Sequence, residues 1–256
     1  MILFNEIAYG PIHSRRLGLS LGLNTMPTDA KLCTFDCVYC ECGFSRPCLH
    51  PKLPAVEEFK SALETKLNAL KAEHLTPDVL TFSGNGEPTL HPEFLAIIKT
   101  TISLRNKYCP EAKVSVLSNS TQLYRDDVRE ALLMVDNRIL KLDSAIDSTM
   151  QLIDRPVNKQ LTVSKIVDYL KTFNGNFILQ TCFLRGSYEG QTFDNTTKRE
   201  LDAWYSIVEL LQPKEVMIYV IDRETPVKNL EKITRKEMED IAEVLRRKHI
   251  KVMVTA

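Results

Sequence analysis

The stretch DVLTFSGNGEPTLHPEFLAIIKTTISLRN, residues 78–106, joins a short apolar run to a longer amphipathic run through a turn rich in glycine and proline. The run 78–83 predicts a strand, and the periodicity of 92–106 predicts a helix. A strand followed by a helix is the repeating unit of parallel sheets. This stretch therefore indicates an α/β fold.

The same unit recurs on both sides of this stretch. Further strands are predicted at 17–23, 113–117, 138–142, 177–183, 216–221 and 250–254, and further helices at 55–73, 126–134, 163–172, 195–211 and 234–248. We expect a single domain over residues 1–256, because no repeat, low-complexity tract or flexible linker interrupts the series. Its C-terminal helix and strand would occupy about 234–255, with Thr234 as the helix cap. Six such units form a partial or full barrel or an open doubly wound sheet, and the pattern alone leaves this choice open.

Polar residues follow most of the predicted strands. In chain order they are Gly84–Glu87, Ser118–Ser120, Asp143–Ser144, Gly186 and Asp222–Arg223. Ligands bind at the carboxyl ends of the strands in both barrels and open sheets. The sequence therefore predicts a binding site at this rim.

The charge balance and the N-terminal segment limit the classes of function. The chain has 33 Lys plus Arg and 33 Asp plus Glu, so its formal net charge is zero, which argues against a strong general nucleic-acid footprint but leaves room for a local basic patch. No apolar run approaches the ~18 residues that suggest a membrane span. The start, MILFNEIAYG, carries Glu6 and lacks the basic segment of a secretory signal. We expect a cytoplasmic protein that is a monomer and does not bind membranes.

A dense cluster of cysteines lies after the first predicted strand. Five of the seven cysteines fall between residues 33 and 48, and Cys33, Cys37 and Cys40 lie within one loop, 33–40. Short spacings of this kind let one loop supply several thiolate ligands to an iron–sulfur cluster. Three cysteines leave one iron of a cubane without a protein ligand, so that iron is open to a substrate or cofactor.

Two other interpretations of these cysteines remain open. A zinc site would need four ligands, and Cys42 or Cys48 would supply the fourth. A thioredoxin-type redox pair of Cys37 and Cys40 would need a helix N-terminus, which the surrounding sequence does not suggest. The two remaining cysteines, Cys109 and Cys182, are expected to be structural.

Several motifs together resemble one enzyme superfamily. The CxxxCxxC pattern of residues 33–40, with Tyr39 before the third cysteine, resembles the signature of the radical S-adenosylmethionine (radical SAM) enzymes. Residues 9–22 are similar to the lead-in strand of a bacterial and archaeal branch related to the wyosine-base-forming tRNA enzymes. Residues 83–90 resemble that branch's form of the Gly-Gly-Glu motif, although Asn85 separates the glycines, and residues 219–223 resemble its sixth strand. The likeness covers about residues 8–225.

This resemblance implies a fold, two cofactors and a chemistry. The fold would be a partial (βα)6 barrel of the TIM type, and Cys33, Cys37 and Cys40 would hold a 4Fe-4S cluster whose unique iron is chelated by S-adenosylmethionine. Reductive cleavage of S-adenosylmethionine would give a 5′-deoxyadenosyl radical that abstracts hydrogen from a substrate. The residues expected to contact the cofactor are Tyr39, Gly84, Asn85, Gly86, Glu87, Ser118, Asn119, Lys141, Asp143 and Ile221. Candidates for an anionic substrate are Arg15, Arg16, Arg155, Arg185 and Arg223.

The resemblance also implies partners and competing functions. An external one-electron donor such as flavodoxin or ferredoxin would reduce the cluster. The substrate would be an RNA base, a peptide or protein, or a small molecule. A glycyl-radical-enzyme activase is the alternative within the superfamily. A zinc-stabilised binding module without catalysis is the alternative from another class.

Overall fold

One curled sheet forms the centre of the protein. The computed structural model describes residues 2–46 and 51–256, so Cys48 lies outside the described residues. Eight strands follow the spatial order β1-β2-β3-β4-β5-β6-β9-β11. Among the described strands of this sheet, only β1 and β2 pair antiparallel, and every other neighbouring pair is parallel. The strands are β1 Ala8–Ser14, β2 Gly18–Leu23, β3 Val79–Phe82, β4 Lys113–Ser118, β5 Asn137–Lys141, β6 Ile178–Cys182, β9 Glu215–Tyr219 and β11 Val252–Thr255.

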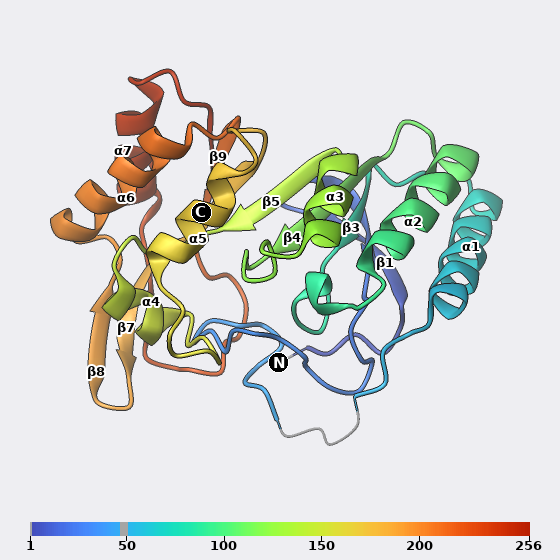
Figure 1. Ribbon diagram of the computed structural model, residues 1–256, viewed down its shortest axis with the longest axis horizontal. Coiled ribbons are helices and arrows are strands. Elements are labelled where there is room, and N and C mark those ends of the chain that lie inside the picture. The colour runs from blue at the N-terminus through green and yellow to red at the C-terminus, as the bar shows by residue number, and fades with distance from the viewer. Residues whose placement is uncertain (1, 47–50) are drawn as a thin grey trace.

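Helices cover the outer face of this sheet. Figure 1 shows α1, α2 and α3 side by side over one half of the sheet, with α6 and α7 near β9 at the other end. The helices are α1 Val56–Ala72, η1 Pro88–Leu90 (a 3₁₀ turn), α2 Phe94–Tyr108, α3 Asp126–Met134, α4 Asp147–Ile153, α5 Val163–Lys171, α6 Lys198–Leu211 and α7 Arg235–Arg246. The molecule is therefore a single α/β domain with a parallel half-barrel, as the resemblance implied.

Burial explains why these segments form these elements. Every residue of β3 and β6 is buried, as expected for strands that lie between helices and a filled barrel interior. The apolar stripe of α1, Phe59, Leu63, Leu67 and Leu70, is buried against the sheet. Thr234 caps α7 in a capping box with Glu237, which confirms the cap expected from the sequence.

A second, smaller sheet was not predicted. It consists of three antiparallel strands in the order β10-β7-β8, with β7 at Leu184–Tyr188, β8 at Gln191–Asp194 and β10 at Leu230–Lys232. The β7–β8 hairpin turns at Glu189 and Gly190, both with positive φ (50° and 77°). Gly186 was expected at the rim of the main sheet, but it lies inside β7 and pairs with Leu230 of β10. These strands are short and mostly half-buried or exposed, so they lack a clear apolar alternation.

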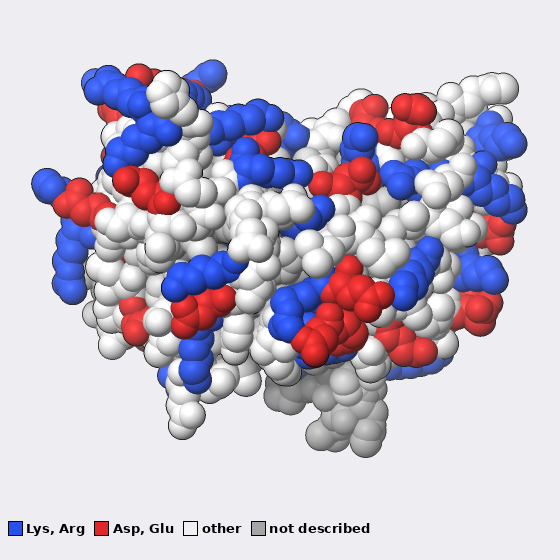
Figure 2. All heavy atoms as spheres, turned by 45° about the horizontal axis from the view of Figure 1, so that its top comes forward, with Lys and Arg blue, Asp and Glu red and all other residues white. Residues whose placement is uncertain are grey.

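The described surface carries both signs of charge. On the face seen in Figure 2, Lys and Arg side chains lie among Asp and Glu side chains, in keeping with the balanced composition. None of the described helices combines the length and the apolar character needed to cross a lipid bilayer.

Candidate functional site

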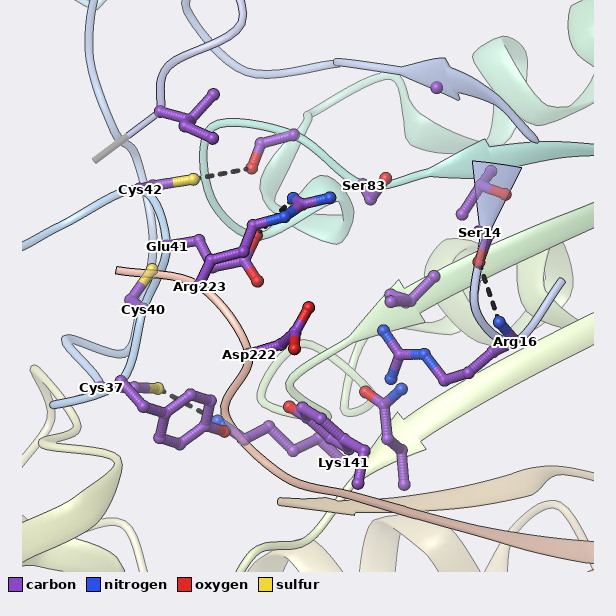
Figure 3. Close-up of a pocket in the computed structure, with 18 of the residues that line it drawn as sticks. Ser14, Arg16, Cys37, Cys40, Glu41, Cys42, Ser83, Lys141, Asp222 and Arg223 are labelled. Atoms are coloured by element: carbon purple, nitrogen blue, oxygen red, sulfur yellow. Dashed lines mark hydrogen bonds and ion pairs between the residues drawn. The ribbon is translucent and has the colours of Figure 1, made fainter. Parts of the chain in front are cut away.

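A cavity of about 620 Å³ opens at the carboxyl ends of the strands. The cysteine loop forms one wall, and the turns after β3 and β4, the end of β5 and the segment after β9 form much of the rest. Figure 3 shows Cys37, Cys40 and Cys42 along one side of this space, with Lys141 below and Asp222 and Arg223 toward its centre. The polar rim expected from the sequence therefore encloses a real cavity.

Backbone hydrogen bonds hold the cysteine loop in place. On one side it pairs with residues 153–157, where the amides of Asp36 and Val38 donate to the carbonyl oxygens of Asp154 (3.0 Å) and Ile153 (2.9 Å). On the other side, Leu32 exchanges hydrogen bonds with the turn after β3, through Asn85 (2.8 Å) and Glu87 (3.0 Å). The path of the loop is thus fixed by main-chain contacts on both sides of the cysteines.

The thiols of the loop differ in environment. Burial raises the pKa of Cys33 to about 12 and raises the pKa of Cys37 well above its usual value. A hydrogen bond from Cys42 lowers the pKa of Cys40 to about 6. The single proton of the Cys42 thiol has a second acceptor, the carbonyl oxygen of Gly84, which lies 3.3 Å from the sulfur. The loop therefore combines one thiol whose pKa is lowered with two whose pKa is raised by burial.

Lys141 lies directly below the loop, where its ammonium opposes but does not cancel the rise in the pKa of Cys37. Its Nζ lies 3.0 Å from the Sγ of Cys37, 2.6 Å from Asp154 Oδ1 and 3.1 Å from Asp143 Oδ2. Burial alone would lower the pKa of Lys141, but the two carboxylates raise it well above its usual value. Burial also raises the pKa of Asp154 to about 7, although Lys141 opposes this. Tyr39 donates to Asp143, so the aromatic residue of the motif joins the same buried network.

The turn after β3 brings backbone close to the cysteine loop. Gly86 has a φ of 140°, and a Cβ at this position would lie 1.8 Å from the carbonyl oxygen of Leu32. Only glycine fits here, because both the dihedral angle and the contact exclude a side chain. Asn85 is fully buried and bonds to the backbone of Phe4 and Pro27 at 2.8 Å. Asn85 therefore anchors the N-terminal segment rather than facing the cavity.

Glu87 joins the turns after β3 and β4. Its carboxylate accepts hydrogen bonds from the backbone amides of Asn119 (2.6 Å) and Thr89 (3.1 Å). Burial raises the pKa of Glu87, and these amides oppose the rise. The side chain of Asn119 in turn donates to Thr34 (2.8 Å) and to the Sγ of Cys33 (3.5 Å). Two strand ends and the cysteine loop are thus connected through one carboxylate.

Most of the residues expected at the site line this cavity. They are Cys33, Cys37, Cys40, Tyr39, Gly84, Gly86, Glu87, Ser118, Asn119, Lys141, Ile221, Arg15, Arg16 and Arg223. Four others do not line it: Asn85, Asp143, Arg155 and Arg185. The sequence did not reveal three further residues of the site, Asp154, Gln180 and Tyr219. Gln180 and Tyr219 lie in strands whose sequence is typical of the core. Asp154 follows a short helix, α4, that was not predicted.

The chemistry of the donors fits a thiolate-bound cluster. Three cysteines from one loop border a cavity with room for a ligand, and buried Lys31 and partly buried Lys141 supply positive charge nearby. The thiols raise the pKa of Lys31 although its burial opposes this, so the ammonium and the sulfur atoms are electrostatically coupled. Within residues 2–46 and 51–256, no three His, Cys, Asp or Glu side chains converge on one point at metal-binding distance. The structure therefore gives the donor set but no coordination geometry.

The fold is that of radical SAM enzymes. A radical SAM methyltransferase from Sphaerobacter thermophilus superposes with a TM-score of 0.68 at 12% identity, over 92% of this chain and 65% of that one. TYW1 with a lysine-pyruvate adduct bound gives a TM-score of 0.63 at 15% identity, over 89% of this chain and 73% of that one. These likenesses concern the fold.

By sequence, the chain is similar to UPF0026 proteins. A UPF0026 protein of Methanocaldococcus jannaschii is 34% identical over 173 residues, which are 67% of this chain and 50% of that protein. A protein of Brachyspira hyodysenteriae described as GTPase Obg is 30% identical over 241 residues, which are 90% of this chain and 32% of that protein. The matched region thus spans half of the first of these relatives and 32% of the second. No protein-family model matches it.

Proposed function

We propose that this chain is a radical SAM enzyme that binds a 4Fe-4S cluster through Cys33, Cys37 and Cys40. The observation that carries the proposal is that these three cysteines border one cavity at the carboxyl ends of a parallel half-barrel. When bound, the cluster and S-adenosylmethionine supply a 5′-deoxyadenosyl radical that removes a hydrogen atom from the substrate. The chain's own residues bind, orient and shield these groups.

The remaining wall of the cavity suits S-adenosylmethionine. Gly84 and Gly86 expose backbone next to the cysteine loop, and Ser118 and Asn119 present hydrogen-bonding groups at the end of β4. Ile221 offers an apolar surface for the adenine. Asn85 and Asp143, which do not line the cavity, support this wall from behind through their hydrogen bonds. We assign them a supporting role rather than direct contact.

An external one-electron donor such as flavodoxin or ferredoxin would deliver the electron to the cluster. The substrate would be an RNA base, a peptide or protein, or a small molecule. GTP hydrolysis is not proposed, because the sequence has no G-x-x-x-x-G-K-[ST] segment for a phosphate-binding loop.

Anaerobic reconstitution tests the proposal. We expect a brown protein that contains about four irons per chain, as a cubane requires, and that yields 5′-deoxyadenosine with dithionite and S-adenosylmethionine. Cys37→Ala should lose both the iron and the product. Cys109→Ala is the matched control, because Cys109 is a buried cysteine that does not line the cavity and should leave both unchanged. A colourless protein with one zinc per chain and no product would contradict the proposal.

A further inference from the structure

Arg16 reaches into the cavity, and it has no carboxylate partner among the residues that the structure describes. Figure 3 shows it on the side opposite Cys37, Cys40 and Cys42, with its guanidinium turned toward the open space. The Cζ of Arg16 lies 4.7 Å from the centre of the Tyr219 ring. Its Nη1 is buried, and among the described residues it has no hydrogen-bond partner. A stacked guanidinium with a free buried N–H is arranged to receive a ligand.

The other arginines expected at the substrate are already paired. Arg223 contacts Glu41 at 2.7 Å, and Arg15 contacts Asp222 at 3.5 Å. Arg155 stacks on Phe44 and Tyr188 and pairs with Glu189 outside the cavity. Arg185 pairs with Glu237 at 2.6 Å, also outside it. Arg16 is therefore the one candidate arginine without an ion pair among the described residues.

One cation that lines the cavity has no carboxylate partner in the described chain. Glu41 and Asp222 are each paired with an arginine, and Glu87 is capped by backbone amides. Lys141 is neutralised by Asp143 and Asp154. Among the basic side chains of the described lining, Arg15, Arg223 and Lys141 each have a carboxylate partner, and Arg16 has none. A single unmatched cation favours a ligand group with a single negative charge.

Gln180 provides a second free donor in the same cavity. Its side chain lines the cavity and is only 6% exposed, yet its Nε2 has no hydrogen-bond partner within the described chain. Gln180 lies on β6 two residues before Cys182, whose partner on β9 is Tyr219. Side chains alternate along a strand, so Gln180 shares a face with Cys182, next to the ring on which Arg16 stacks. A buried amide that lacks a partner costs free energy unless a ligand satisfies it.

We propose that Arg16 and Gln180 form a subsite for a carboxylate group of the substrate. A carboxylate carries one negative charge and accepts paired hydrogen bonds from a guanidinium, which matches the unpaired charge and the two free donors. This inference rests on the proposed function, because a substrate is expected only if the chain is an enzyme. The methionine part of S-adenosylmethionine also carries a carboxylate and is the other candidate for this subsite. The location of Arg16 across the cavity from the cysteines favours the substrate as the source.

Acetate serves as the probe. In the full reconstituted chain with ¹⁵N-labelled arginine, we expect acetate to shift one side-chain Nε–H resonance, and Arg16→Gln should remove that resonance. Neutral acetamide should cause no shift. Arg15→Gln removes the same charge from the same cavity and should leave the acetate affinity within about twofold, whereas Gln180→Met should weaken it. If no arginine resonance responds to acetate, or if Arg15→Gln weakens binding as much as Gln180→Met does, the subsite is wrong.

A second measurement identifies the source of the carboxylate. The affinity for S-adenosylmethionine should change less than twofold in Arg16→Gln. A tenfold loss would assign Arg16 to the cofactor's carboxylate and overturn the substrate subsite. The acetate-induced shift can also be measured in the cluster-free chain, where it reports on the subsite alone. A protein that binds acetate but no iron would contradict the proposed function and support the anion subsite.

Discussion

The Nζ of Lys141 lies 3.0 Å from the Sγ of Cys37, where the thiol is buried and the lysine side chain is only 11% exposed. The same ammonium contacts Asp154 and Asp143, so one cation serves two carboxylates and a thiol. Removing it would leave negative charge without compensation in a region of low dielectric. This relationship leads to two predictions, one about stability and one about the redox behaviour of the proposed cluster.

Lys141→Met should destabilise the cluster-free protein by about 3–5 kcal/mol, the usual cost of removing one partner of a buried ion pair. The double change Lys141→Met with Asp154→Asn should recover part of this loss, because it removes one of the carboxylates left without a partner. Urea unfolding of the three proteins measures the effect. A single variant within about 1 kcal/mol of the parent would mean that the network contributes little.

The double variant Lys141→Met with Asp154→Asn removes one charge of each sign. It therefore also tests whether Lys141 affects the reduction potential of the proposed cluster. A hydrogen bond from an ammonium to a ligating sulfur stabilises the reduced, more negative state. We expect its loss to lower the reduction potential of the reconstituted cluster by roughly 50 mV, close to a tenfold change in the equilibrium of a one-electron couple. Redox titration followed by electron paramagnetic resonance measures this. Asp154→Asn alone is the control and should not lower the potential, since it retains the ammonium.

Gly86→Ala should destabilise the protein by at least about 3 kcal/mol, because the new Cβ would overlap the Leu32 carbonyl at a strained dihedral angle. It should also reduce iron uptake by displacing the start of the cysteine loop. Gly190→Ala is the matched control: its φ is also positive (77°), but nothing lies within 4 Å of the added Cβ. Thermal unfolding should show a loss of only about 1 kcal/mol there. Equal losses would show that the contact with Leu32 does not matter.

His91 should make stability depend on pH. Its Nε2 donates to the carbonyl of Pro54 (3.0 Å), and its Nδ1 accepts from the amide of Glu93 (3.1 Å), so the buried ring is held neutral. Burial lowers the pKa of His91 in the folded state. The unfolded chain, with a pKa of about 6.5, then binds a proton that the folded chain does not, and stability falls as the pH drops below that value.

The expected slope from this one group is up to about 1.4 kcal/mol per pH unit. Denaturant unfolding between pH 5 and pH 7, in steps of about half a unit, measures it. His91→Gln should flatten this part of the profile. His249→Gln is the control, because His249 is exposed, and it should leave the profile as in the parent. A His91→Gln profile with the same slope as that of the parent would contradict the assignment.

Much of the fold could be predicted because its main elements have strong local signals. The strand and helix of the stretch 78–106 appear as β3 and α2, and α3 has the predicted bounds. The small sheet could not be predicted, since β10 joins β7 through residues more than forty positions away and neither strand has a buried face throughout. Long-range pairing of weakly apolar segments leaves little trace in sequence.

The site shows the same division. The cysteine motif and the Gly86-Glu87 turn could be predicted, because chemistry and backbone geometry restrict those positions to few residue types. Gln180 could not, because a polar residue in an apolar strand signals neither which face it occupies nor whether its donors are satisfied. The separation of Arg16 from four other arginines likewise depends on ion pairs between distant parts of the chain.

The main-chain hydrogen bonds on both sides of the cysteine loop have one more consequence. They involve no sulfur atom, so the loop should keep its course when it carries no metal. If oxygen destroyed the proposed cluster, the cysteine loop would then keep its conformation. Rebuilding the cluster would require only iron, sulfide and electrons. Recovery after exposure to air should accordingly proceed without renewed synthesis of the polypeptide.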